Sequence, residues 1–107
     1  MSEPARMAAL RERIDALDEQ LVELLNARAA CALEIGEVKR AIGMEIYQPD
    51  RERSVLQHVR SVNAGPLDGD AIARLFERII DEARRLERNV AQSGHEAVHR
   101  RPASSGE

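Results

Sequence analysis

A long stripe of apolar residues, spaced alternately four and three apart, is the feature that most constrains this chain. Its apolar members are Leu10, Ile14, Leu17, Leu21, Leu24, Cys31, Ile35, Val38 and Ile42. This heptad spacing keeps one face of a long helix against its neighbours. It predicts a first helix over about residues 5–42, with Gly43 as the stop signal. Gly36 interrupts the pattern but keeps its register, which indicates a close packing contact.

Arg28 occupies one position of this stripe, where a charged side chain is unexpected. Its guanidinium does not deprotonate, so burial is costly unless an anion meets it. Lys39, the only lysine of the chain, lies about three helical turns further on, so both cations can face one cavity. Either a carboxylate elsewhere in the chain neutralises Arg28, or the interior receives an anionic ligand.

Two shorter helices are expected over about residues 49–63 and 69–90. Pro49 favours the first turn of one, and Gly65-Pro66 ends it. Asp68 or Asp70 caps the other. The apolar stripe of this last helix consists of Ile72, Leu75, Phe76, Ile79, Ile80 and Ala83, and it continues to Leu86 and Glu87. These helices define a domain over residues 1–91, and residues 92–107 are expected to form a flexible C-terminal tail.

The composition favours an all-α fold. Hydrophobic residues make up 43% of the chain, but aromatic residues only 2%, and 33% are charged, which is typical of packed helices rather than sheets. A first helix of roughly 55 Å is too long for a compact monomer of this size, and two short helices cannot cover its stripe. We therefore expect three helices per chain, one very long, in an intertwined homodimer.

Several classes of function are disfavoured. The net charge of −3 argues against nucleic acid as a partner, and no segment is apolar enough to span a membrane. The single cysteine, Cys31, excludes an internal disulfide and fits a reducing cytoplasm. His95-Glu96-Ala97-Val98-His99 has the spacing of a zinc protease motif, but it lies in the polar tail without a third ligand downstream. We therefore expect no metal site at this motif.

Polar residues on or beside the apolar faces suggest a binding site. They are Arg28, Lys39, Arg51, Glu52 and Glu87. Several cations with one or two carboxylates in an apolar pocket are typical of a receptor for a small dianion. Arg11 could reach the cavity of the other subunit in an antiparallel dimer. The alternative is that Arg28–Glu87 and Lys39–Glu52 are structural ion pairs, and Arg84, Arg85 and Arg88 are interpreted as an exposed face.

These residues and their spacing resemble the AroQ class of all-helical chorismate mutases. The segments that carry the resemblance are Leu10-Arg-x-x-Ile-Asp-x-Leu-Asp18, Leu24-Leu-x-x-Arg28, Ile35-Gly-x-x-Lys39, Pro49-Asp-Arg-Glu52, Gly65-Pro-Leu67 and Leu75-Phe-x-x-Ile-Ile80. The likeness is greatest to the mutase domain of bifunctional chorismate mutase–prephenate dehydratases. Because no dehydratase part is present, the chain resembles a free-standing mutase or an excised domain.

The resemblance implies conversion of chorismate to prephenate by a Claisen rearrangement, in phenylalanine and tyrosine biosynthesis, without cofactor or metal. Arg28, and Arg11 from the other subunit, would hold the substrate carboxylates, and Arg51 would add positive charge. Lys39 would donate to the ether oxygen and a carboxylate, while Glu52 would bind the ring hydroxyl. The resemblance thus makes Arg28, Lys39 and Glu87 the catalytic residues.

Three positions depart from the family pattern. Glu87 stands where many members have Gln, so it must be protonated to donate to the ether oxygen. Ala83 replaces a Ser that binds a carboxylate, and Gln48 replaces an Asp that helps to orient the substrate hydroxyl. Two alternatives remain: an isochorismate pyruvate-lyase with the same fold, or a non-catalytic helical module that regulates a shikimate-pathway enzyme.

Overall fold

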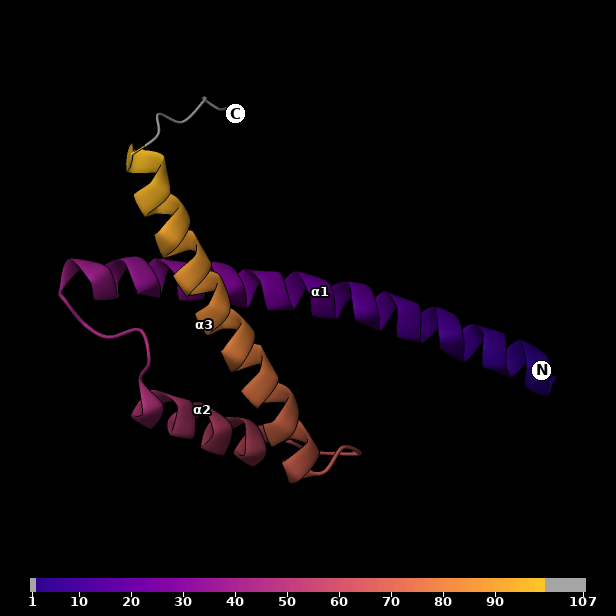
Figure 1. Ribbon diagram of the computed structural model, residues 1–107. Helices are drawn as coiled ribbons and strands as arrows, with labels where there is room; N and C mark the ends of the chain where they lie inside the picture. The colour runs from indigo at the N-terminus through magenta and orange to yellow at the C-terminus, as the bar shows by residue number, and fades with distance from the viewer. Residues whose placement is uncertain (1, 100–107) are drawn as a thin grey trace. The chain divides into compact units, whose positions relative to one another are not determined.

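The computed structural model describes the backbone of residues 2–99 and the side chains of residues 2–93. Three α-helices form in the order α1 (Glu3–Ala41), α2 (Pro49–Val62) and α3 (Gly69–His99), as Figure 1 shows. No strand occurs between residues 2 and 99. The predicted all-helical class, with three helices of which one is very long, is confirmed.

The chain divides into two compact units, Met1–Cys31 and Ala32–Glu107. The first unit contains most of α1. Its apolar stripe is open to solvent in the single chain, from Leu10 at 44% exposure to Leu24 at 66%. The second unit contains the last turns of α1 together with α2 and α3. An exposed apolar stripe of this length is unusual for a protein that acts as a monomer.

Gly43 ends α1 because it adopts a left-handed backbone conformation, with φ of +73°. Its N–H donates to the carbonyl of Arg40 at 3.3 Å, and the N–H of Met44 donates to the carbonyl of Lys39 at 2.7 Å. This pair of bonds is a Schellman motif, which satisfies the last carbonyls of a helix. The predicted stop signal at Gly43 is confirmed, and the chain leaves α1 directly beside Lys39.

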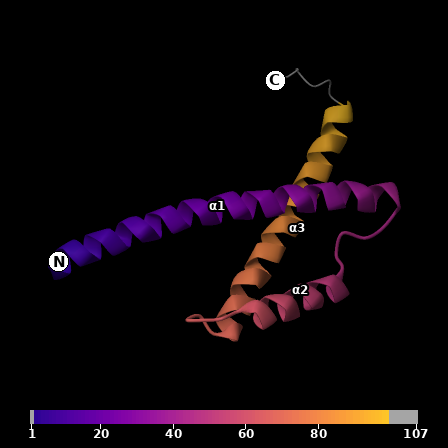
Figure 2. The ribbon, with the colours of Figure 1, turned by 180° about the vertical axis from the view of Figure 1, so that it is seen from behind.

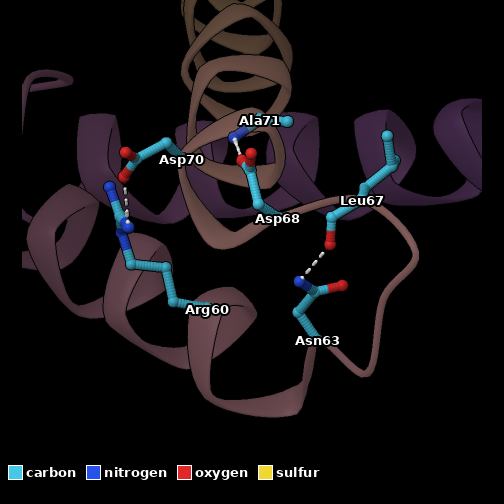
Figure 3. A network of polar contacts seen from close by, with 6 residues as sticks. All are labelled: Arg60, Asn63, Leu67, Asp68, Asp70 and Ala71. Carbon is cyan, nitrogen blue, oxygen red and sulfur yellow. Dashed lines mark hydrogen bonds and ion pairs between the residues drawn. The ribbon is translucent and has the colours of Figure 1, made fainter.

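The turn between α2 and α3 is held by side-chain bonds to the backbone (Figure 3). Asn63 Nδ2 donates to the carbonyl of Leu67 at 2.7 Å. Asp68 Oδ1 accepts a bond from the N–H of Ala71 at 2.7 Å, which caps the N-terminus of α3. Of the two aspartates proposed as caps, Asp68 is the one that binds the helix backbone.

Asp70, the other candidate cap, instead joins α3 to α2. Its Oδ1 lies 2.8 Å from a terminal guanidinium nitrogen of Arg60 (Figure 3). The hydrogen bond from Arg60 and the positive charge of that side chain lower the pKa of Asp70 below its usual value of 3.8. The pair is solvent-exposed, so water screens it and its contribution to stability is small.

A small apolar core lies between α2 and α3. Val59 on α2 and Ala73 and Ile80 on α3 are its buried members. Figure 1 and Figure 2, which view the chain from opposite sides, both show α2 adjoining the N-terminal part of α3. The pairing fixes α2 relative to α3, and hence the positions of the polar side chains that these helices carry.

The third helix continues to His99, so its expected end near residue 90 is too early. The polar composition after residue 91 suggests a tail, yet Ala91 and Gln92 favour a helix, and one Gly at position 94 does not end it. Residues 100–107, the remainder of the expected tail, lie outside the described residues. No helix between residues 2 and 99 has the length and apolarity of a membrane span.

Candidate active site

Glu87 is a buried charged side chain of the second unit, with 5% of its surface exposed. It lies against Gly36 near the end of α1, where a Cβ atom built on the glycine would be 2.8 Å from Glu87 Oε2. The close packing contact predicted at Gly36 is therefore confirmed. Oε2 is buried and has no hydrogen-bond partner among the side chains and backbone that the structure describes. A buried, unsatisfied carboxylate oxygen is costly, which makes this position a candidate binding site.

Lys39 lies one helical turn beyond Gly36 and is partly buried. Its Nζ donates a hydrogen bond of 2.9 Å to the carbonyl of Ile46, in the segment between α1 and α2. An ammonium group has three donors, and this carbonyl takes one of them. Two residues later Gln48 precedes α2, and its Nε2 donates to the carbonyl of Glu45 at 2.9 Å. The segment between α1 and α2 is thus held in place by hydrogen bonds from Lys39 before it and from Gln48 at its end.

Glu52 forms an ion pair with a residue that was not expected in the site. Its Oε2 lies 3.2 Å from Nε of Arg84 on α3, and both side chains are about three-quarters buried. The guanidinium of Arg84 also lies 5.0 Å from the ring centroid of Tyr47, within the range of a cation–π interaction. Asp81, one turn earlier on α3, is a second carboxylate partner of Arg84.

A series of contacts links the last turns of α1, the segment that follows them, α2 and α3. Lys39 and Gly36 are one turn apart on α1, and Arg84 and Glu87 are one turn apart on α3. Glu52 stands on the first turn of α2. We call this set the junction cluster: Gly36, Lys39, Ile46, Tyr47, Glu52, Arg84 and Glu87. It combines two cations with two carboxylates, and so offers both strong donors and strong acceptors to a ligand.

The remaining predicted site residues lie outside this cluster. Arg51 is exposed on the first turn of α2, and Ala83 is partly exposed beside Arg84 on α3. Arg11 is exposed and Arg28 partly buried, both on the part of α1 that belongs to the first unit. Of the predicted residues, the junction cluster therefore contains Lys39, Glu52 and Glu87. Gln48 lies directly before α2 in the same unit, while Arg11 and Arg28 lie in the other unit.

Two sequence-based interpretations need correction. The structural ion pair between Lys39 and Glu52 does not form, because Lys39 bonds to the Ile46 carbonyl and Glu52 pairs with Arg84. The predicted exposed face of Arg84, Arg85 and Arg88 is wrong for Arg84, which is mostly buried. The sequence did carry a signal: Arg84 is four residues after the buried Ile80 and three before Glu87, so all three share one face of α3.

No group of three or more His, Cys, Asp or Glu residues within the described part of the chain is arranged to hold a metal ion. The side chains of the motif from His95 to His99 lie outside that part. The junction cluster itself contains a lysine and an arginine beside its carboxylates. Such a set suits an organic anion with hydroxyl groups better than a metal cation.

The chain matches the family model described as chorismate mutase type II over residues 10–88. It is 40% identical to the bifunctional chorismate mutase/prephenate dehydratase of Stutzerimonas stutzeri over 97% of its length, which is 30% of that relative. The corresponding protein of Escherichia coli K12 is also 40% identical, over 72% of this chain and 20% of the relative. The chain thus spans less than a third of the length of these curated relatives.

The fold of this chain also matches those of solved chorismate mutase structures. The chorismate mutase of Thermus thermophilus (Form II) matches with a TM-score of 0.76 and 31% identity, over 78% of this chain and 94% of that one. The chorismate mutase of Helicobacter pylori, solved in complex with prephenate, matches with a TM-score of 0.76 and 28% identity, over 82% and 96% of the two chains. Nearly the full length of these two proteins therefore corresponds to this chain.

Proposed function

Because the chain belongs to the chorismate mutase type II family, we propose that it catalyses the rearrangement of chorismate to prephenate. One observation carries the proposal: the match over residues 10–88 includes every candidate site residue, from Arg11 to Glu87. The mixed charges of the junction cluster support it, because chorismate is a dianion that also carries a hydroxyl group. The reaction contributes to the synthesis of phenylalanine and tyrosine.

The chemistry requires neither a nucleophile nor a proton transfer. One carbon–oxygen bond breaks while one carbon–carbon bond forms within a single molecule. The site selects the compact conformer of a flexible substrate, which lowers the entropic part of the barrier. It then stabilises the negative charge that develops on the ether oxygen as the bond to it breaks.

We assign the donor to the ether oxygen to Lys39, which has two further N–H groups besides the one bonded to Ile46. Glu87 donates a second hydrogen bond when it is protonated; its burial beside Gly36 supports this role. Glu52 accepts a bond from the ring hydroxyl, with Gln48 nearby in the chain, directly before α2. Ala83, the residue before Arg84 on α3, completes the substrate-binding set.

The substrate carboxylates are bound by arginines. Arg28 holds one carboxylate, Arg11 of the partner subunit reaches the other, and Arg51 adds positive charge at the start of α2. A guanidinium binds a carboxylate with two parallel hydrogen bonds, which fixes orientation as well as charge. Arg28 together with Lys39 and Glu87 forms the catalytic set in this proposal.

The active form is an intertwined homodimer. The exposed apolar stripe of α1 supports this part of the proposal, because it consists of large aliphatic side chains such as Leu17 and Leu21, 54% and 55% exposed. At 1.5 Å per residue the 39 residues of α1 extend roughly 58 Å, a length that a second copy can cover. The single cysteine supports a cytoplasmic location, where thiols stay reduced.

A direct assay tests the proposal. The purified chain is incubated with chorismate, the loss of chorismate absorbance is followed, and the products are identified. We expect prephenate from the wild type and almost none from Arg28→Ala, while Arg13→Ala, which removes an exposed arginine of the same helix, retains activity. Release of pyruvate would indicate the lyase instead. Full activity in Arg28→Ala would refute the role assigned to Arg28.

A further inference from the structure

Arg84 contacts several parts of the second unit, although the proposed function gives it no role. Its Nε pairs with Glu52 on α2 at 3.2 Å, and its guanidinium lies 5.0 Å from the ring centroid of Tyr47 in the segment before α2. It also pairs with Asp81 on its own helix. One side chain thus contacts three different parts of the structure, and among these partners Glu52 is the one with a role in the proposed site.

The side chains of the Arg84–Glu52 pair are less exposed than those of a surface ion pair. The side chains of Arg84 and Glu52 are 26% and 24% exposed, whereas both members of the Arg53–Asp50 pair are at least 70% exposed. Partial burial reduces screening by water, so the orientation of the Glu52 carboxylate depends more strongly on its partner. The guanidinium of Arg84 is also held in place, because it lies over the ring of Tyr47.

The geometry of the pair leaves the carboxylate able to bind a ligand. Arg84 Nε lies near Oε2 of Glu52, and the contact lacks hydrogen-bond geometry. A carboxylate accepts about four hydrogen bonds in total. Glu52 is therefore held by charge attraction, and its lone pairs are not saturated by Arg84.

We propose that Arg84 is a positioning residue, which holds the Glu52 carboxylate in the orientation that binds the ring hydroxyl of the substrate. The inference rests on the proposed function, since it gives Glu52 a hydroxyl to bind. Without Arg84, the carboxylate samples several rotamers, and ordering it costs free energy at the moment of binding. The effect is therefore a weaker affinity for the substrate, with little change in the chemical step.

A double-mutant cycle tests the inference. Arg84→Met keeps an unbranched stem beside Tyr47 but removes the charge, and Glu52→Gln removes the carboxylate. We expect each single variant to raise KM by about tenfold with kcat nearly unchanged, the size expected when a hydrogen bond to a charged group is weakened. The double variant should also show about a tenfold rise, because Arg84 acts only through Glu52. Arg85→Ala, which removes the exposed neighbouring arginine, is the matched control and should leave KM unchanged.

The outcomes distinguish this inference from the proposed function. A rise of about a hundredfold in the double variant, or none in Arg84→Met, overturns the positioning role while an active wild type leaves the mutase function intact. Circular dichroism shows whether each variant keeps its helices, so a loss of folding is recognised separately. A wild type that does not convert chorismate overturns the function and the inference together.

Discussion

Glu87 lies so close to Gly36 that its position depends on the glycine having no side chain. A Cβ atom on Gly36 would be 2.8 Å from Oε2 and 3.4 Å from Cγ of Glu87, and non-bonded contacts as short as the first do not persist. The glycine therefore lets the carboxyl group pack directly on the backbone of α1. The packing of the last turns of α1 against α3 and the placement of a proposed catalytic group depend on this same contact.

Gly36→Ala should reduce activity more than stability. The added methyl group displaces the flexible end of Glu87, while alanine improves helix propensity by about 1 kcal/mol, which offsets part of the strain. We expect kcat/KM to fall by about tenfold or more, and the free energy of unfolding to change by no more than about 1 kcal/mol. Steady-state kinetics and urea unfolding measure the two quantities. Gly69→Ala, where the nearest atom is 3.4 Å from the added carbon, is the control, and unchanged activity in Gly36→Ala would contradict the assignment of Glu87.

The rate should depend on a hydrogen-bond donor at position 87. A carboxylate only accepts hydrogen bonds and repels the developing negative charge, whereas a protonated carboxyl group or an amide donates to it. We therefore expect Glu87→Gln, whose amide is a donor, to keep kcat at or above the wild-type value, and Glu87→Leu, which has a similar size but no donor, to lower kcat by about tenfold or more. Steady-state kinetics with chorismate measure this. Equal kcat values in the two variants would rule out the explanation.

A charge on the apolar stripe of α1 should prevent self-association. Leu21→Arg places a guanidinium in the middle of the surface that we assign to the partner, whereas Glu23→Arg changes the charge at a position off the stripe. Light scattering coupled to size-exclusion chromatography should give a dimer for the wild type and for Glu23→Arg, and a monomer for Leu21→Arg. The monomer should also be nearly inactive, because Arg11 of the partner subunit is then missing. A dimeric, active Leu21→Arg protein would exclude this interface.

The Asp70–Arg60 pair should stabilise the fold only above acidic pH. Because the pKa of Asp70 in the folded state lies below its usual value of 3.8, the ionised form favours folding. The stabilisation is fully present above that value and is lost as the pH falls through the lower folded pKa. Thermal unfolding should show a small difference between wild type and Asp70→Asn near neutral pH that disappears on acidification. Asp15→Asn, which removes an exposed carboxylate elsewhere, is the control, and a difference that persists in acid would count against the ion pair.

The sequence was sufficient to predict the helices because their boundaries depend on local chemistry. Gly43, Pro49 and Gly65-Pro66 act through backbone conformation and do so in any tertiary context. The end of α3 was predicted less well. Polar composition does not distinguish an exposed helix from a mobile tail, because both avoid burial of apolar surface.

The candidate site was harder to predict because it depends on which of several adjacent charged residues faces inward. Arg84 and Arg85 are chemically identical, yet the roughly 100° between successive residues of a helix makes one partly buried and the other exposed. The partner of Lys39 could not be deduced from side-chain types at all, since it is a backbone carbonyl. Helical periodicity predicts which of the two arginines faces inward, whereas the partner of Lys39 follows only from the path of the chain.

The bond between Lys39 and the Ile46 carbonyl also determines which sequence changes the segment between α1 and α2 can tolerate. Every amino acid has a carbonyl oxygen, so the contact makes no demand on the identity of residue 46. Substitutions there leave the acceptor in place, whereas inserting or deleting a residue between Gly43 and Ile46 moves it away from the ammonium group. The segment can therefore vary in sequence during evolution or design as long as its length is retained.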